Sequence, residues 1–110
     1  MTEGVLKGGG VWIGAPRPDE EFVVAEGLET CLSAMLILKC RCGVAVLGPN
    51  FKGLVLPRTA QRIHIAADND ETGIPAAQHA KVVWSQRGLD VRISYPAIKG
   101  WDFNNELLGR

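Results

Sequence analysis

The 110-residue chain is long enough for one domain with a buried core and too short for two, and its 46% hydrophobic and 22% charged residues are typical of globular proteins. Twelve Lys and Arg residues balance twelve Asp and Glu residues, which argues against a domain that grips nucleic acid through a basic surface of its own. No apolar stretch reaches the roughly 20 residues of a membrane span and no signal peptide is visible, so we expect a cytoplasmic protein without membrane contact.

Residues 1–21 are rich in glycine and proline and predict a lead-in to the domain. Residues 11–13, Val-Trp-Ile, lie between a glycine-rich and a proline-rich segment and can form a short edge strand. We expect the folded domain to cover residues 22–110 and interpret the chain as part of a larger protein.

Residues 22–61 alternate between strand and helix patterns. Residues 22–26 form an apolar run closed by a carboxylate and a glycine, and residues 28–38 are helix-forming and apolar on nearly every side, which predicts a buried helix. Residues 44–47 predict a second buried strand. Residues 51–61 contain Gly53 and Pro57 and predict at most a short helical turn.

The second half of the chain continues this alternation. Residues 62–67 predict a third strand, residues 72–87 a helix stopped by Gly88, residues 91–95 a fourth strand and residues 104–108 a last helical turn. Because parallel strands require crossover connections, this order predicts an α/β fold: a roughly four-stranded parallel sheet with helices on both faces.

Two acidic segments follow predicted strands. Glu26 ends the first strand, and Asp68 and Asp70 follow the third. Ligands of open α/β sheets bind at the carboxyl ends of the strands, so we expect these side chains at one edge. Aspartates one residue apart, with α-carbons about 6–7 Å apart, can both reach a divalent cation such as Mg²⁺. Asp-Asn-Asp is also common in solvated turns, and its joint placement with Glu26 favours the metal site.

Glu26 and Gly27 have one interpretation each, whereas Glu29, Glu71 and Asp102 have two. Glu26 beside a metal-bound phosphate can act as general acid or base, and Gly27 lets the chain turn and a phosphate approach the backbone. Glu29 and Glu71 lie at the starts of predicted helices, where they either favour the helix or support the site. Asp102 either caps the last helix or supports the site.

The other reactive side chains are interpreted as structural. Cys31, Cys40 and Cys42 lack the paired spacing of a zinc ribbon and are expected to be buried or half-buried thiols. His64 is expected to pack within its strand, and Tyr95, the single tyrosine, to lie at a strand end.

Three segments strongly resemble motifs of the Toprim domain, the metal-binding fold of bacterial-type primases, topoisomerases and certain nucleases. They are AEGLET at 25–30, AADNDETGIPAA at 66–77 and KGWDFNNELL at 99–108, the last resembling the segment that closes this domain in primases. The resemblance spans about residues 22–108 and implies a Toprim-type, Rossmann-like fold. It also implies Glu26 as the acid/base carboxylate, Asp68 and Asp70 as ligands of Mg²⁺ or Mn²⁺, and Gly27 and Gly73 as glycines that let phosphate or nucleotide approach.

The resemblance also implies a function. Cellular primases usually carry an aspartate four positions after the glutamate, and Thr30 stands there, which favours the phage and plasmid branch. The implied function is the catalytic domain of a DNA primase, which makes RNA primers from NTPs on single-stranded DNA. The parent would be a phage, plasmid or mobile-element primase-helicase with flanking zinc-binding and helicase domains. A Toprim nuclease with the same metal site and a non-catalytic Toprim scaffold remain alternatives.

Overall fold

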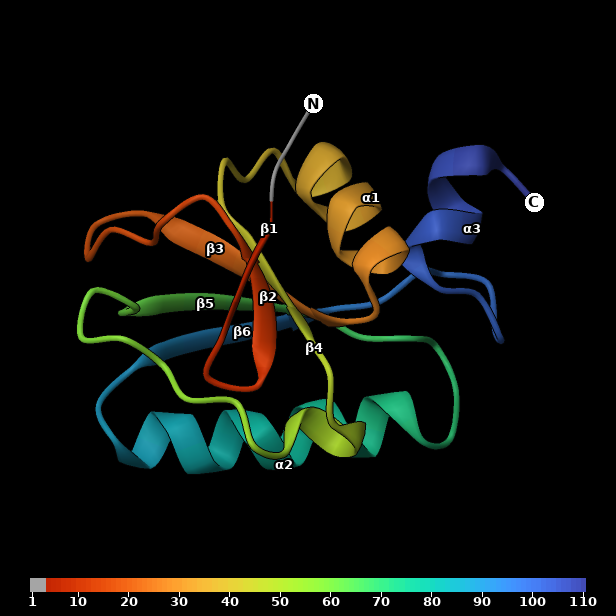
Figure 1. The fold of residues 1–110 in the computed structure, drawn as a ribbon. Helices are drawn as coiled ribbons and strands as arrows, with labels where there is room; N and C mark the ends of the chain where they lie inside the picture. Colours follow the sequence, from red (N-terminus) through yellow and green to blue (C-terminus); the bar gives the residue numbers. More distant parts are fainter. Residues whose placement is uncertain (1–3) are drawn as a thin grey trace.

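The structure, a computed structural model, describes residues 4–110, so residues 1–3 of the predicted lead-in lie outside it. A six-stranded sheet lies between two layers of helices (Figure 1). Helices α1 (Leu28–Leu38) and α3 (Phe103–Leu108) cover one face, and α2 (Gly73–Gln86) covers the other together with the short 3-10 helix η1 (Pro49–Phe51). None of the helices in residues 4–110 has the length and apolar character needed to cross a membrane.

Four strands form the parallel part of the sheet. They are β3 (Glu21–Glu26), β4 (Gly43–Val46), β5 (Arg62–Ala66) and β6 (Asp90–Ser94), and they lie side by side in the order β4-β3-β5-β6. The predicted α/β fold with a parallel sheet and helices on both faces is therefore confirmed.

An antiparallel hairpin extends this sheet beyond β4. Strand β2 (Gly10–Ile13) pairs with β4, and β1 (Gly4–Lys7) pairs with β2 and forms the outer edge. The strand expected at residues 11–13 is present, but β1 covers it, so it is an interior strand. Gly8 and Gly9 make the turn possible because their φ angles of 58° and 82° favour glycine and suit a tight hairpin.

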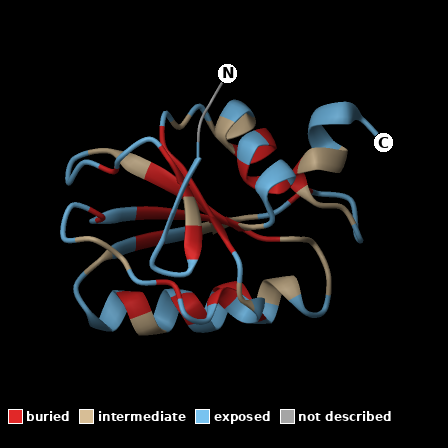
Figure 2. Cartoon of the chain, in the orientation of Figure 1, coloured by how far each residue is buried: buried red, intermediate tan, exposed pale blue. Residues whose placement is uncertain are grey.

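The core consists of two layers, one on each side of the sheet, and Figure 2 shows the buried residues along the central strands. Phe22 and Val24 of β3 point into the layer against α2, and Val23 and Ala25 point into the layer under α1. A strand buried on both faces needs a continuous apolar run rather than alternation, which explains the sequence of β3.

Helix α1 packs closely on the sheet at Gly43. A Cβ atom at this position would lie 2.9 Å from the Cys31 sulfur, closer than real Cβ contacts.

Cys31 and Cys42 are buried and Cys40 is half-buried, and none forms a disulfide, as expected. Burial raises the pKa of the Cys31 thiol to about 12 and that of Cys42 to about 11, so both remain protonated and unreactive at neutral pH.

The connection from β4 to β5 differs from the prediction. A short helical turn was expected within residues 51–61, but the short helix lies earlier, at Pro49–Phe51. Residues 52–61 are neither helix nor strand. The proline at the start of the short helix has the fixed φ of a first helical position. Asn50 and Phe51 both have positive φ, 56° and 61°, so the turn cannot continue as a regular helix.

Candidate functional site

The site lies where the sheet changes direction of winding. The chain leaves β3 for α1 on one face of the sheet and leaves the adjacent β5 for α2 on the other face (Figure 1). The carboxyl ends of two such neighbouring strands border an open crevice, because their connections diverge. Glu26 ends β3, and Asp68 lies two residues after the end of β5, so both acidic segments reach this crevice.

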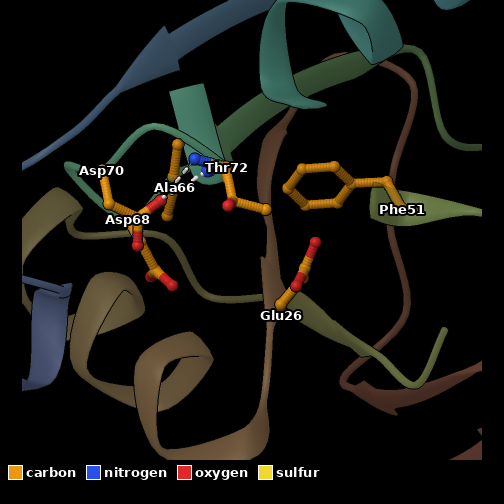
Figure 3. A pocket seen from close by; sticks show the side chains of 8 residues that line it. Glu26, Phe51, Ala66, Asp68, Asp70 and Thr72 are labelled. Carbon is orange, nitrogen blue, oxygen red and sulfur yellow. Dashed lines mark hydrogen bonds between the residues drawn. The ribbon is translucent and has the colours of Figure 1, made fainter. Parts of the chain in front are cut away.

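A small pocket of about 70 Å³ occupies the crevice (Figure 3). Its size suits an ion with bound water or a single phosphate group. In Figure 3 the two aspartates lie together on one side and Phe51 lies on the other. The pocket is lined by Glu26, Phe51, Ala66, Ala67, Asp68, Asp70, Thr72 and Gly73.

Asp70 binds the start of α2. Its Oδ1 accepts hydrogen bonds from the backbone N–H groups of Thr72 and Gly73, at 3.1 Å and 2.5 Å. Thr72, at the N-cap position, makes no capping bond with its own side chain, so Asp70 takes over this role. Within residues 4–110 no hydrogen bond engages the other carboxylate oxygen of Asp70, which leaves that oxygen for a ligand.

Asp68 lies in the most negative surroundings of the pocket. Burial raises its pKa, and the charges of Asp102, Asp70 and Glu26 raise it further, to about 6. None of these four acids forms an ion pair with a Lys, Arg or His among the described residues. The carboxylates therefore repel one another without a cation of the protein to offset them.

This donor set fits a hard divalent cation with few protein ligands. Within residues 4–110, no three His, Cys, Asp or Glu side chains are close enough to form a complete metal site. Mg²⁺ needs no such site, because it is commonly held by one or two carboxylates with water and substrate phosphates completing the shell. Asp68 and Asp70 are the residues that fit this role.

The segment that leads into α3, residues 96–102, packs against the loop that carries Asp68 and Asp70, which we call the aspartate loop. The N–H of Asn69 donates to the Trp101 carbonyl at 2.9 Å, and the N–H of Gly100 donates to the Asn69 carbonyl at 2.6 Å. The Asn69 side chain also donates to the Pro96 carbonyl at 2.7 Å. Residues 96–101 are thereby tied to the loop that carries the two aspartates.

Asp102 combines its two predicted roles. Its Oδ1 accepts the N–H of Asn105 at 2.8 Å and the Asn105 side chain accepts the N–H of Asp102 at 2.9 Å, which forms a reciprocal cap at the start of α3. The same carboxylate contributes to the raised pKa of Asp68. It therefore stabilises a helix and adds negative charge to the site.

The two candidate glycines lie differently. Gly27 has a φ of 84° just before α1, and a Cβ there would meet no atom within 4 Å, so the space beside it is open. A Cβ at Gly73 would lie 2.5 Å from the Asp68 carbonyl oxygen, so this glycine lets α2 begin against the aspartate loop. Gly73 lines the pocket, and Gly27 does not.

Glu29 and Glu71 are exposed and do not line the pocket. Glu29 lies in the first turn of α1, and its Oε2 accepts a long hydrogen bond of 3.5 Å from the Asn104 side chain. Glu71 lies in the turn between Asp70 and α2. The structure brings Glu26, Asp68, Asp70 and Gly73 together and leaves these two glutamates at the surface.

Four pocket residues were not among the site residues predicted from the sequence: Phe51, Ala66, Ala67 and Thr72. Phe51 is buried, has a positive φ and packs edge-on against Trp84 at 6.5 Å between ring centroids. The proline after β4 indicated a turn there, but nothing local indicated that the turn folds back over Glu26.

A larger hollow of about 470 Å³ near Trp12 and Pro57 contains no Asp, Glu, His or Cys and offers no ligands for a hard metal ion.

Comparison with known protein families matches the Toprim domain family over residues 21–110. No curated protein and no solved structure matches the chain significantly. Toprim domains occur in primases, topoisomerases and nucleases and typically bind Mg²⁺ through acidic residues, in agreement with the carboxylates at this crevice. The matched region covers nearly the whole chain, and the protein belongs to the Toprim domain family.

Proposed function

We propose that the chain is the catalytic domain of a DNA primase and transfers nucleotides from NTPs to a growing RNA primer on single-stranded DNA. The observation that supports this most directly is the position of Asp68, whose pKa is raised first by burial and then by the charges of Asp102, Asp70 and Glu26, carboxylates from three separate segments. Such a cluster is unfavourable by itself and favourable around a cation that binds phosphate.

The residues divide the chemistry between them. Asp68 and Asp70 would hold Mg²⁺ or Mn²⁺. When bound, the ion polarises the phosphate and offsets the charge that develops on the leaving pyrophosphate. Glu26 faces the same pocket and accepts the proton of the attacking 3′-hydroxyl as its oxygen bonds to the α-phosphorus and the bond to pyrophosphate breaks.

The primase assignment within the family rests on the segment after β6. Residues 99–108 resemble the closing motif of primase Toprim domains, and their hydrogen bonds with Asn69 join this motif to the aspartate loop. Because the chain has no net charge, most of the affinity for the single-stranded DNA template would come from flanking domains of the parent protein. We propose a zinc-binding domain before the chain and a helicase domain after it, as in phage and plasmid primase-helicases.

The test uses the parent protein with labelled single-stranded DNA, NTPs and Mg²⁺ or Mn²⁺. New RNA that depends on the metal and is lost in Asp68→Asn supports the primase. Shortening of the DNA by the same metal-dependent site indicates the nuclease instead. If neither product forms and the 110-residue chain shows no Mg²⁺ or Mn²⁺ binding by calorimetry, both catalytic proposals are wrong and a scaffold role remains.

A further inference from the structure

A second cluster of reactive side chains crosses the sheet at β3, β5 and β6 and shares no side chain with the carboxylate pocket. His64 lies in the middle of β5 and its side chain is 5% exposed. Its Nδ1 lies 3.1 Å from Oε1 of Glu21 on β3, and its Nε2 lies 2.6 Å from Oγ of Ser94 on β6. The proposed nucleotidyl transfer uses none of these three residues.

The hydrogen bonds define which atom of the imidazole carries the proton. Glu21 is held ionised, because the Arg92 guanidinium and then His64 lower its pKa against the opposing effect of burial. An ionised carboxylate only accepts hydrogen bonds, so His64 must donate to it from Nδ1. Burial lowers the pKa of His64, which keeps the ring neutral and leaves Nε2 as an acceptor for the Ser94 hydroxyl.

This arrangement has the geometry of a nucleophile, a base and an orienting carboxylate. The Ser94 hydroxyl points its proton at Nε2, and the Glu21 carboxylate holds the opposite nitrogen. Arg92 fixes Glu21 through two hydrogen bonds, from Nε to Oε2 at 2.6 Å and from Nη2 to Oε1 at 2.8 Å. The orienting carboxylate is therefore itself held in place.

Ser94 is partly exposed. It is half-buried at the end of β6, which is the last strand of the sheet. Helix α1 packs mainly over β3 and β4, and α2 packs against the opposite face of β6 (Figure 1). The contacts of α1 thus reach little of β6, the strand that carries Ser94.

We propose that Ser94, His64 and Glu21 form a second, metal-independent site that transfers acyl groups from activated carboxylic esters to water. Ser94 Oγ bonds to the carbonyl carbon while His64 Nε2 takes its proton. The ester C–O bond breaks and the alcohol leaves with that proton. Water then attacks the carbonyl carbon of the acyl-serine and gives one proton to His64 Nε2. The bond from that carbon to Ser94 Oγ breaks, His64 returns the proton to Oγ, and the carboxylic acid leaves.

The test uses the 110-residue chain in EDTA, so that no metal-bound water contributes. We expect p-nitrophenyl acetate to be cleaved and a fluorophosphonate probe to label Ser94, located by peptide mass mapping. Ser94→Ala should abolish the label and lower the rate about 10²-fold or more, the usual effect of losing a base-assisted nucleophile. Ser85→Ala, which alters an exposed serine on α2, should leave both unchanged.

Matched histidine variants separate the site from ordinary imidazole chemistry. His64→Gln should lose the activity, and His79→Gln, at an exposed histidine of α2, should keep it. Glu21→Gln keeps the shape of the orienting residue and should also lower the rate, and thermal unfolding checks that each variant is folded. Ester cleavage that follows His79, an adduct on Cys40 instead of Ser94, or no adduct at all would overturn the proposal.

Discussion

The three site carboxylates differ in their surroundings at the scale of single residues. Asp68 is surrounded by other acids, Asp70 accepts backbone hydrogen bonds, and Glu26 ends a strand beside the pocket. These differences predict different effects of replacing each one, although all three are acidic residues at the same edge of the sheet.

Asp68→Asn should stabilise the metal-free chain and remove its stabilisation by Mg²⁺. The pKa of Asp68 rises from 3.8 to about 6, which corresponds to about 3 kcal/mol at about 1.36 kcal/mol per pKa unit. Solvent screening of this half-exposed group reduces the expected gain to about 1 kcal/mol. Urea unfolding in EDTA and in excess Mg²⁺ measures both effects.

Asp70→Ala should have the opposite sign in the same experiment. It removes the acceptor for the N–H groups of Thr72 and Gly73 and should cost about 0.5–2 kcal/mol, as for other lost N-caps. If Asp68→Asn destabilises the chain as much as Asp70→Ala does, Asp68 has a structural role and the metal site is wrongly assigned.

Glu26→Gln should leave the fold and the metal affinity nearly unchanged and lower primer synthesis by the parent protein about 10²–10⁴-fold, the usual contribution of a general acid or base. The amide keeps the shape of the side chain and cannot accept the proton. Initial rates with saturating NTPs measure the loss. A variant that keeps more than half of the wild-type rate would exclude this role for Glu26.

At the scale of elements, Asp102 links a helix cap to the charge of the site. Asp102→Ala should lower stability by about 0.5–2 kcal/mol because α3 loses its cap. Asp102→Asn keeps an acceptor for the Asn105 N–H and removes only the charge, so it should stay close to wild-type stability. Chemical denaturation of both variants separates the roles, and equal losses would show that the charge itself stabilises α3.

At the scale of the whole molecule, the Glu21–His64–Ser94 network joins three strands and makes stability depend on pH. The folded pKa of His64 lies below 6.5, so the unfolded chain takes up this proton first and stability falls as the pH drops below 6.5. The folded pKa of Glu21 lies below 4.5, so its contribution is present above 4.5 and is lost as the pH falls through the folded value.

Asp68 acts in the opposite direction between its two pKa values. Its raised pKa means that the folded, metal-free chain binds the proton first, so this group adds stability as the pH falls from about 6 to 3.8. Unfolding free energies measured across this range in the Asp68→Asn variant should therefore fall more steeply on acidification than those of the wild type. A profile unchanged by the variant would contradict the raised pKa.

The sequence alone determined the order of the elements from residue 22 onward and the placement of three carboxylates at one edge of the sheet. The strand at 22–26 and the helix at 28–38 are apolar runs that differ in length and are separated by Gly27, which distinguishes strand from helix. Glu26, Asp68 and Asp70 lie at or just after the ends of strands, and these ends must share one edge in a parallel sheet. Local patterns were sufficient because each of these features depends on residues close in the chain.

Only the tertiary structure decided the features that join distant segments. The position of β2 inside the sheet depends on its pairing with β1. Phe51 lines the carboxylate pocket only because of the way η1 folds. The His64 network joins residues 21, 64, 92 and 94 from three strands. Strand order and register set these contacts, and neither can be read from local periodicity. His64 therefore gave no sign in the sequence of the carboxylate and hydroxyl that the sheet places on its two nitrogens.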